Sequence, residues 1–174
     1  GVTINPVYDR TDIVDKALNT ARNTLIEGAI LVAIVLFLFL GEFRSALVVI
    51  VTLPLAMLFA FICMERFGMS ANLMSLAGLA IGIGMMVDGA VVMVENAFRQ
   101  LAHKHPGASR GEVVLHAAQA MAQPISFAIL IIIVVFLPLF ALTGLEGKRF
   151  KPMAYAITFA MAGSLILSLT LVPV

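Results

Sequence analysis

The residue with the clearest chemical role is Asp88, because its carboxylate lies far inside an apolar stretch of sequence. About twenty uncharged residues precede it, and six separate it from Glu95. A charged carboxylate is costly inside a membrane, so such residues usually have a function, and burial favours the neutral, protonated form. A carboxyl group that gains and releases a proton there is the central component of a proton relay. The alternative is a structural Asp that stays protonated or ion-paired.

Glu95 lies seven residues after Asp88 on the same predicted helix. Seven steps of 100° return to within about 20° of the starting direction, and the rise along the axis is roughly 10 Å. The two carboxylates therefore share one stripe of the helix. Glu95 is either the exit of the proton relay or a solvated residue at the membrane edge, and the spacing favours neither.

Four glycines surround Asp88 on this helix. Gly78 and Gly82 form a small-xxx-small pair, and Gly84 and Gly89 lie on either side of Asp88. Small residues let helices in membranes approach closely and slide past each other. We predict that all four pack against other helices, whether or not sliding is part of the function.

Methionine is concentrated in the same stretch, at Met74, Met85, Met86 and Met93. Thioether sulfur is a soft ligand that suits Cu(I) and Ag(I). Met86 and Met93 are seven residues apart, so they share a face, which lies about 160° from that of Asp88. One helix would therefore have a proton face and a sulfur face. Methionine also fills gaps in apolar cores, which is the alternative.

The overall composition excludes an ordinary soluble domain. Hydrophobic residues make up 61% of the chain and charged residues 12%, against about 45–50% and about 25% in soluble domains. The net charge of +1 indicates no nucleic-acid partner. The sequence contains no Ser/His/Asp set, zinc-ligand spacing or phosphate-binding glycine loop, so we expect neither an enzyme nor a bound cofactor. His103 and His105 form at most a weak metal site and are more simply interpreted as solvated.

Five stretches are long enough to cross a bilayer as helices, which takes about 20 apolar residues. They are residues 24–41, 45–64, 70–94, 125–142 and 153–174. Backbone groups inside lipid must be hydrogen-bonded within the segment, which favours helices. We therefore predict an all-α fold, a polytopic transmembrane bundle of five spanning helices. Because both ends resemble interrupted segments, we interpret the chain as part of a longer protein.

The segments between the spans complete the predicted organisation. Residues 1–23 contain an amphipathic helix that runs into the first span, and residues 24–95 hold three spans joined by short turns, one of them at Gly68. Residues 96–123 form a loop in which Ser109 and Glu112 make a capping box, so we predict a short surface helix that ends at Pro124. Residues 124–174 hold the last two spans, joined by a loop over residues 143–152. The positive-inside rule alone would put the N-terminal end in the cytoplasm.

The run from Gly84 to Asn96, GMMVDGAVVMVEN, resembles the fourth transmembrane helix of resistance–nodulation–division (RND) permeases. Its V-D-x-A-x-V-x-x-E-N pattern is specific to that superfamily. Further similarities in residues 6–10, 43–47 and 144–152 extend the resemblance over the whole chain, as helices two to six of the N-terminal half of a permease. This resemblance places the N-terminal side in the periplasm and residues 96–123 in the cytoplasm, which overrules the charge rule.

The branch of the superfamily follows from single positions. Where multidrug members carry a second Asp, this chain has Gly89, which resembles the heavy-metal branch. Divalent-cation members usually carry a further Asp at the position of Gly82. Members that export Cu(I) and Ag(I) carry methionines at positions that match Met74, Met86, Met93 and Met161. The resemblance therefore implies a metal path along these four methionines and favours Cu(I) or Ag(I) over divalent cations.

The resemblance also implies a proton antiporter, in which Asp88 and Glu95 relay protons and Asp88 pairs with a lysine on a helix outside this chain. It implies a multi-pass homotrimer in the lipid bilayer of the inner membrane of a Gram-negative bacterium. A periplasmic adaptor protein and an outer-membrane channel protein are the expected partners, and metal ions are the expected substrate. The alternatives are an RND permease for drugs or other organic compounds, and a non-transporting membrane assembly module, which would have no use for Asp88.

Overall fold

The computed structural model describes residues 10–41, 43–103 and 109–173, and within them every regular element is a helix. The helices are α1 (Arg10–Leu40), α2 (Phe43–Arg66), α3 (Leu73–Ala102), α4 (Arg110–Ala141) and α5 (Gly144–Thr170). All five are long and apolar enough to cross a membrane. The predicted all-α fold with five spanning helices is therefore confirmed.

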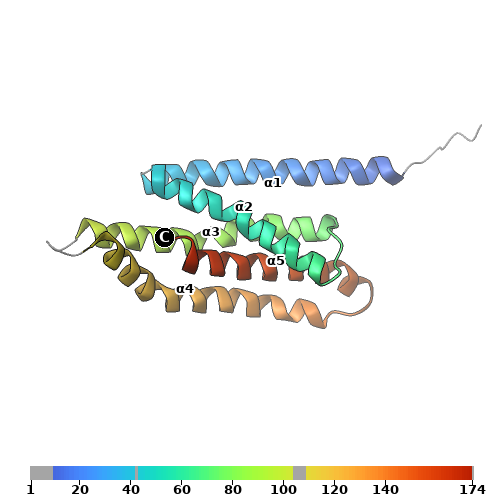
Figure 1. The fold of residues 1–174 in the computed structure, drawn as a ribbon. Helices are drawn as coiled ribbons and strands as arrows, with labels where there is room; N and C mark the ends of the chain where they lie inside the picture. The colour runs from blue at the N-terminus through green and yellow to red at the C-terminus, as the bar shows by residue number, and fades with distance from the viewer. Residues whose placement is uncertain (1–9, 42, 104–108, 174) are drawn as a thin grey trace, which may run out of the picture.

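The five helices form a bundle with α3 and α5 at its centre (Figure 1). In this view α1 forms one edge of the bundle and α4 the opposite edge, while α2 crosses obliquely between them. Both edge helices expose large apolar side chains, among them Leu31, Leu38, Phe127 and Val135. Such surface is suited to a lipid bilayer or to further helices rather than to water.

Two glycines follow the first two helices where the sequence predicts turns. Gly41 has a φ of +65° and Gly68 a φ of +66°, a left-handed conformation that residues with a side chain disfavour. The Gly68 N–H donates to the Glu65 carbonyl at 3.0 Å, and the Met69 N–H donates to the Met64 carbonyl at 2.9 Å. These bonds satisfy carbonyl groups at the end of α2, which confirms Gly68 as its stop.

Both α1 and α3 are single long helices. α1 joins the amphipathic segment to the first span without a break, as predicted. α3 begins with a capping box that was not predicted, in which Asn72 Oδ1 accepts from the Ser75 N–H at 3.0 Å and Ser75 Oγ accepts from the Asn72 N–H at 2.9 Å. It then continues past its predicted end near Val94 to Ala102.

α4 differs most from its prediction. The capping box is confirmed, because Ser109 Oγ accepts from the Glu112 N–H at 3.1 Å and Glu112 Oε2 accepts from the Ser109 N–H at 3.0 Å. The predicted end at Pro124 is wrong, since one helix runs on to Ala141 and contains both Pro124 and Pro138. A proline removes one backbone donor and bends a helix without having to end it, and α4 is bent in its N-terminal part (Figure 1). Most of residues 96–123 is therefore helical.

The loop predicted over residues 143–152 is also largely helical. α5 begins at Gly144, with Thr143 as its N-cap, and Pro152 lies inside it. The connection from α4 is thus reduced to Leu142 and Thr143. Packing within a bundle compensates for the hydrogen bond that a proline removes, which the local rule for proline does not take into account.

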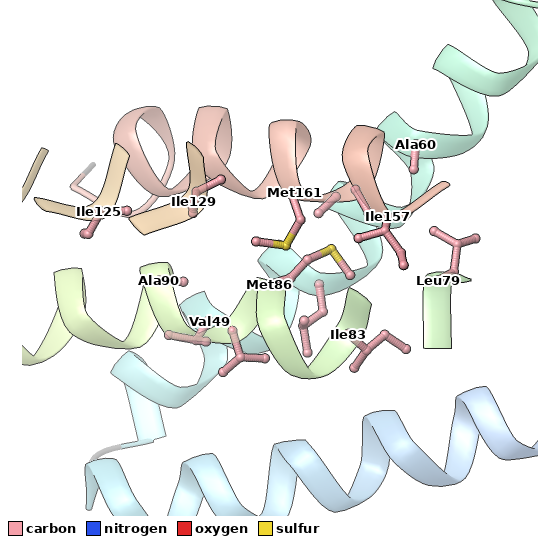
Figure 2. Close-up of a cluster of buried hydrophobic side chains, with 14 of the residues drawn as sticks. Val49, Ala60, Leu79, Ile83, Met86, Ala90, Ile125, Ile129, Ile157 and Met161 are labelled. Carbon is pink, nitrogen blue, oxygen red and sulfur yellow. The ribbon is translucent and has the colours of Figure 1, made fainter. Parts of the chain in front are cut away.

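The core of the bundle is the seam between α3 and α5, which run in the same direction (Figure 1). Three glycines of α3 face residues of α5 at intervals along the seam. The facing pairs are Gly78–Met153, Gly82–Ala160 and Gly89–Ser168. Figure 2 shows the buried side chains around this seam. Those that are almost fully buried come mainly from α3 and α5 and include Leu79, Met86, Met93, Ile157 and Met161. The seam therefore fixes the position of α3.

Replacing Gly78 by Ala is expected to destabilise the bundle by about 1–3 kcal/mol, the usual cost of overpacking. A Cβ at Gly78 would lie 2.6 Å from the Met153 carbonyl oxygen and 3.1 Å from its Cα, so the backbone of α5 has to move. The measurement is thermal unfolding of the full-length protein in detergent. Gly82→Ala is the matched control, because a Cβ there would meet Ala160 at an ordinary 3.7 Å. Equal stability of the two variants would contradict the close approach at Gly78.

Candidate functional site

Asp88 lies in the middle part of α3, with its side chain exposed at the side of the bundle in apolar surroundings. It lines two cavities. One, of about 250 Å³, lies between α3 and α4 and has Ile125 and Ile129 in its wall. The other, of about 210 Å³, lies between α3 and α1 and has Leu31 and Val35 in its wall. Asp88 therefore stands in a groove between α1 and α4, with α3 as its floor.

The Asp88 carboxyl group has no hydrogen-bond or ion-pair partner within the described residues. No basic side chain from that part of the chain lines either cavity. A charged carboxylate between such walls loses hydration without compensation. The groove therefore favours one of two states of Asp88. The carboxyl group is either protonated, or it is charged and paired with a cation from beyond these five helices. A proton relay alternates between these two states.

Glu95 is exposed, further along α3 than Asp88. Its neighbour Asn96 links two helices, because the Asn96 side-chain amide donates to the Ala117 carbonyl of α4 at 3.0 Å. This link joins the end of α3 to the beginning of α4. It was not predicted, because the contact depends on which helix packs against α3, and the sequence of α3 alone does not contain that information.

The four glycines near Asp88 do not share one environment. Gly78, Gly82 and Gly89 are buried against neighbouring helices, as predicted. Gly84 has no such neighbour within the described residues, because a Cβ there would meet no atom within 4 Å, so its packing role stays a prediction. It lines the cavity between α3 and α1 that also contains Asp88. Gly84 therefore widens the groove and does not tighten the seam.

Three of the four methionines of the predicted metal path are buried in the core. Met86 is 2% exposed, Met93 1% and Met161 0%, whereas Met74, near the start of α3, is half-buried. Figure 2 shows the side chains of Met86 and Met161 pointing toward one another across the α3–α5 seam. Since Asp88 is exposed whereas Met86 and Met93 are buried, these two methionines lie on a different face of α3 from the carboxylate. Met85 does not, because it lines the cavity between α3 and α4 together with Asp88. The role of the four methionines as a metal path stays a prediction.

The described residues hold no group of three or more His, Cys, Asp and Glu that could bind a metal ion. His103 is exposed at the end of α3, and its Nδ1 lies 3.0 Å from the Arg99 carbonyl oxygen of the same helix. The predicted partner His105 lies outside the described residues.

Comparison with known proteins identifies the family. The sequence profile of the AcrB/AcrD/AcrF family matches residues 1–174. The chain belongs to this family. Among its relatives, the cobalt-zinc-cadmium resistance protein CzcA of Cupriavidus metallidurans is 51% identical over 99% of the chain, and the cation efflux system protein CusA of Escherichia coli strain K12 is 42% identical over 100% of it.

A solved structure of the same kind agrees with the fold. The crystal structure of a heavy metal efflux pump superimposes on this chain with a TM-score of 0.84, and the two sequences are 43% identical. The superposition covers 97% of this chain and 16% of the pump chain. The chain spans 17% of the length of each of the two curated relatives. This member of the AcrB/AcrD/AcrF family therefore represents one helical part of a much larger kind of protein.

The relatives confirm the resemblance to the heavy-metal branch of RND permeases that residues 84–96 indicate. They are efflux and resistance proteins and not enzymes, in agreement with the absence of a catalytic motif. With respect to the metal, they do not favour copper or silver. The relative with 51% identity is named for cobalt, zinc and cadmium, and the one with 42% identity is named for cations.

Proposed function

We propose that the protein to which this chain belongs is a proton-driven efflux permease for heavy-metal ions, and that these five helices contain its proton relay. The observation that supports this most directly is the position of Asp88, a single carboxyl group in an apolar groove beside the packed core. A non-transporting assembly module would gain nothing from a carboxyl group there, since it only adds cost. An organic substrate is not supported, because the relatives are named for metals and cations.

The proton relay works by alternating the charge of Asp88. In its charged form the carboxylate pairs with a basic side chain from a helix beyond this chain. That helix would fill the groove between α1 and α4. Protonation removes the charge and breaks that pair, so the helices on either side of the groove are free to shift relative to each other. An inward movement of one charge releases about 2.3 kcal/mol per 100 mV of membrane potential, before any pH gradient. This energy would drive the shift of α3 and α5 relative to the other helices.

The metal path is proposed to follow the sulfur atoms of Met74, Met86, Met93 and Met161. The facing pair Met86–Met161 supports it, since two thioethers on neighbouring helices can share one soft ion (Figure 2). We therefore favour Cu(I) or Ag(I) as the substrate. Divalent cations are the second candidate, because the relative with 51% identity is named for cobalt, zinc and cadmium. Gly82 argues against them, since the resemblance leads us to expect an Asp at this position in divalent-cation members.

The assembly is proposed from the resemblance to RND permeases. We place a homotrimer in the inner membrane of a Gram-negative bacterium, with a periplasmic adaptor protein and an outer-membrane channel protein as partners. The N-terminal end of α1 then lies on the periplasmic side. Residues 96–123, where Asn96 joins α3 to α4, lie on the cytoplasmic side.

The direct test uses the full-length protein in liposomes with a pH indicator on one side. Addition of the metal substrate is expected to start metal transport together with proton movement in the opposite direction. Collapse of the pH gradient and membrane potential by an ionophore should stop metal accumulation. Metal transport that continues at the same rate after this collapse would rule out proton antiport.

Glu95→Gln is expected to lower the transport rate only a few-fold, because Glu95 is exposed and water can replace part of its function as a proton donor and acceptor. The measurement is metal-driven proton uptake by the full-length protein in liposomes. Glu65→Gln, at the exposed end of α2, is the control and should leave the rate unchanged. Complete loss of uptake in Glu95→Gln would show that Glu95 is an obligatory member of the relay.

A further inference from the structure

A buried serine hydroxyl links the two central helices of the bundle. Ser164 of α5 is 3% exposed, and its hydroxyl donates to the Met86 carbonyl of α3 at 2.7 Å. Other hydroxyls inside helices donate back to a carbonyl of their own helix, the usual local bond of Ser and Thr; they belong to Thr20, Thr24, Thr52 and Thr170. Within the described residues, the Ser164 bond is the only side-chain hydrogen bond between α3 and α5.

The other contacts along the seam constrain the axial position of α3 less sharply. Gly82 faces Ala160, and the large buried side chains around them, such as Leu79 and Ile157, are apolar. Apolar contact has no preferred direction, and small residues let helices in membranes approach closely. A hydrogen bond weakens steeply when its donor and acceptor move out of line. The Ser164 bond is therefore the contact that defines the axial register of α3 and α5 most precisely.

This bond lies beside the facing methionine pair. Its acceptor is the carbonyl of Met86 itself, whose side chain points toward Met161 across the seam (Figure 2). On α5, Ser164 follows Met161 by three residues, which is about 4.5 Å along the axis and about 60° around it. The bond thus joins the backbone that carries one thioether to the helical turn that carries the other. A slip of one residue between the helices would move the sulfur atoms by about 1.5 Å, whereas binding sites hold their ligands to within about 0.5 Å.

We propose that Ser164 is a positioning residue for the transported ion, because its hydrogen bond holds α3 and α5 in the register at which the Met86 and Met161 thioethers can share that ion. The assignment rests on the proposed metal path. Ser164 is not itself a ligand in this scheme, since a hydroxyl oxygen is a hard ligand and a soft ion prefers sulfur. The Met86 carbonyl also accepts the regular backbone bond within α3, so the fold should tolerate loss of the hydroxyl.

The first test measures the affinity of the full-length protein for Ag(I) in detergent, by competition with a coloured chelator. Ser164→Ala removes the hydroxyl at almost constant volume, and we expect the dissociation constant to rise about tenfold, as when residues that orient metal ligands are changed. Ser168→Ala is the matched control. Ser168 is also buried on α5, but its hydroxyl has no hydrogen-bond partner within the described residues, so its removal should leave the affinity unchanged. If Ser164→Ala binds Ag(I) as tightly as Ser168→Ala, the proposal is overturned.

A double-mutant cycle separates the positioning of the two sulfur atoms from a general change in packing. In a Met161→Leu background the pair is already broken, so we expect Ser164→Ala to cause no further loss of Ag(I) affinity. In a Met64→Leu background, which changes a buried methionine of α2, the loss of about tenfold should remain. Residues that act through one site are non-additive in this way, whereas distant and independent sites add.

The outcomes of this cycle distinguish the positioning role from the metal path on which it rests. An equal loss of affinity from Ser164→Ala in both backgrounds would show that the hydroxyl acts through packing alone, which overturns the positioning role and leaves the proposed function intact. If Met161→Leu alone bound Ag(I) as tightly as the unmodified protein, the metal path would be wrong at this pair. The role proposed for Ser164 would then be wrong as well.

Discussion

Asp88→Asn is expected to abolish metal efflux by the full-length protein, with a fall in the transport rate of about a hundredfold or more, the usual contribution of a positioned proton-transfer group. Asn has nearly the same size and shape as Asp, but its amide carries no charge and does not gain or release a proton in this range of pH. Because Asp88 is exposed in a groove and not packed in the core, the fold should tolerate the change. The measurement is metal-driven proton uptake in liposomes, alongside metal resistance of cells.

Two further variants make this result specific. Asp88→Glu keeps a titratable group but extends it by one methylene, and we expect partial uptake with an altered pH dependence, since the cavities beside Asp88 have room for the longer side chain. Asp15→Asn removes a carboxylate from the exposed start of α1 and should leave uptake unchanged. Expression and oligomeric state of all variants are compared by size-exclusion chromatography. If Asp88→Asn gave a folded protein with normal efflux, the proton relay would have to lie elsewhere.

The fold was predictable because its main determinant acts along the chain. A helix that crosses a bilayer needs about 20 apolar residues, and the five such stretches each correspond to one helix of the structure. The errors arose where a local rule met tertiary packing. Pro124 and Pro152 were predicted to end or precede helices, yet both lie inside α4 and α5, because the surrounding bundle compensates for the missing backbone donor.

The site was predictable only as far as it lies on one helix. The opposite faces of Asp88 and Met86 follow from 3.6 residues per turn, and the burial of Met86 and exposure of Asp88 agree with them. The spacing could not distinguish Gly84, which borders a cavity, from Gly89, which packs on α4 and α5. It also could not predict that the buried Ser168 hydroxyl has no hydrogen-bond partner within the described residues. These features depend on which helix packs against which, and a single sequence does not encode that in any local pattern.

The metal preference has the second-largest expected effect. If Met86 and Met161 bind the transported ion, the full-length protein should protect cells against Cu(I) or Ag(I) more than against Zn(II) or Co(II). Thioethers bind soft monovalent ions well and compete poorly for harder divalent ions. Met86→Leu and Met161→Leu should then lower copper or silver transport at least about tenfold, since even changes in the outer shell of a metal site have effects of that size. Transport is measured metal by metal in liposomes.

A buried methionine outside the proposed path provides the control. Met64 on α2 is 2% exposed, as Met86 is, so Met64→Leu exchanges the same side chain at the same burial. The stability cost of each exchange should stay below about 1.5 kcal/mol, because Leu is close to Met in volume. A loss of transport in Met86→Leu and Met161→Leu but not in Met64→Leu therefore reports on the sulfur and not on packing. Equal transport in all three variants would mean that methionine only fills the seam, and the 51% identity to a cobalt-zinc-cadmium resistance protein would then make divalent cations the better substrate.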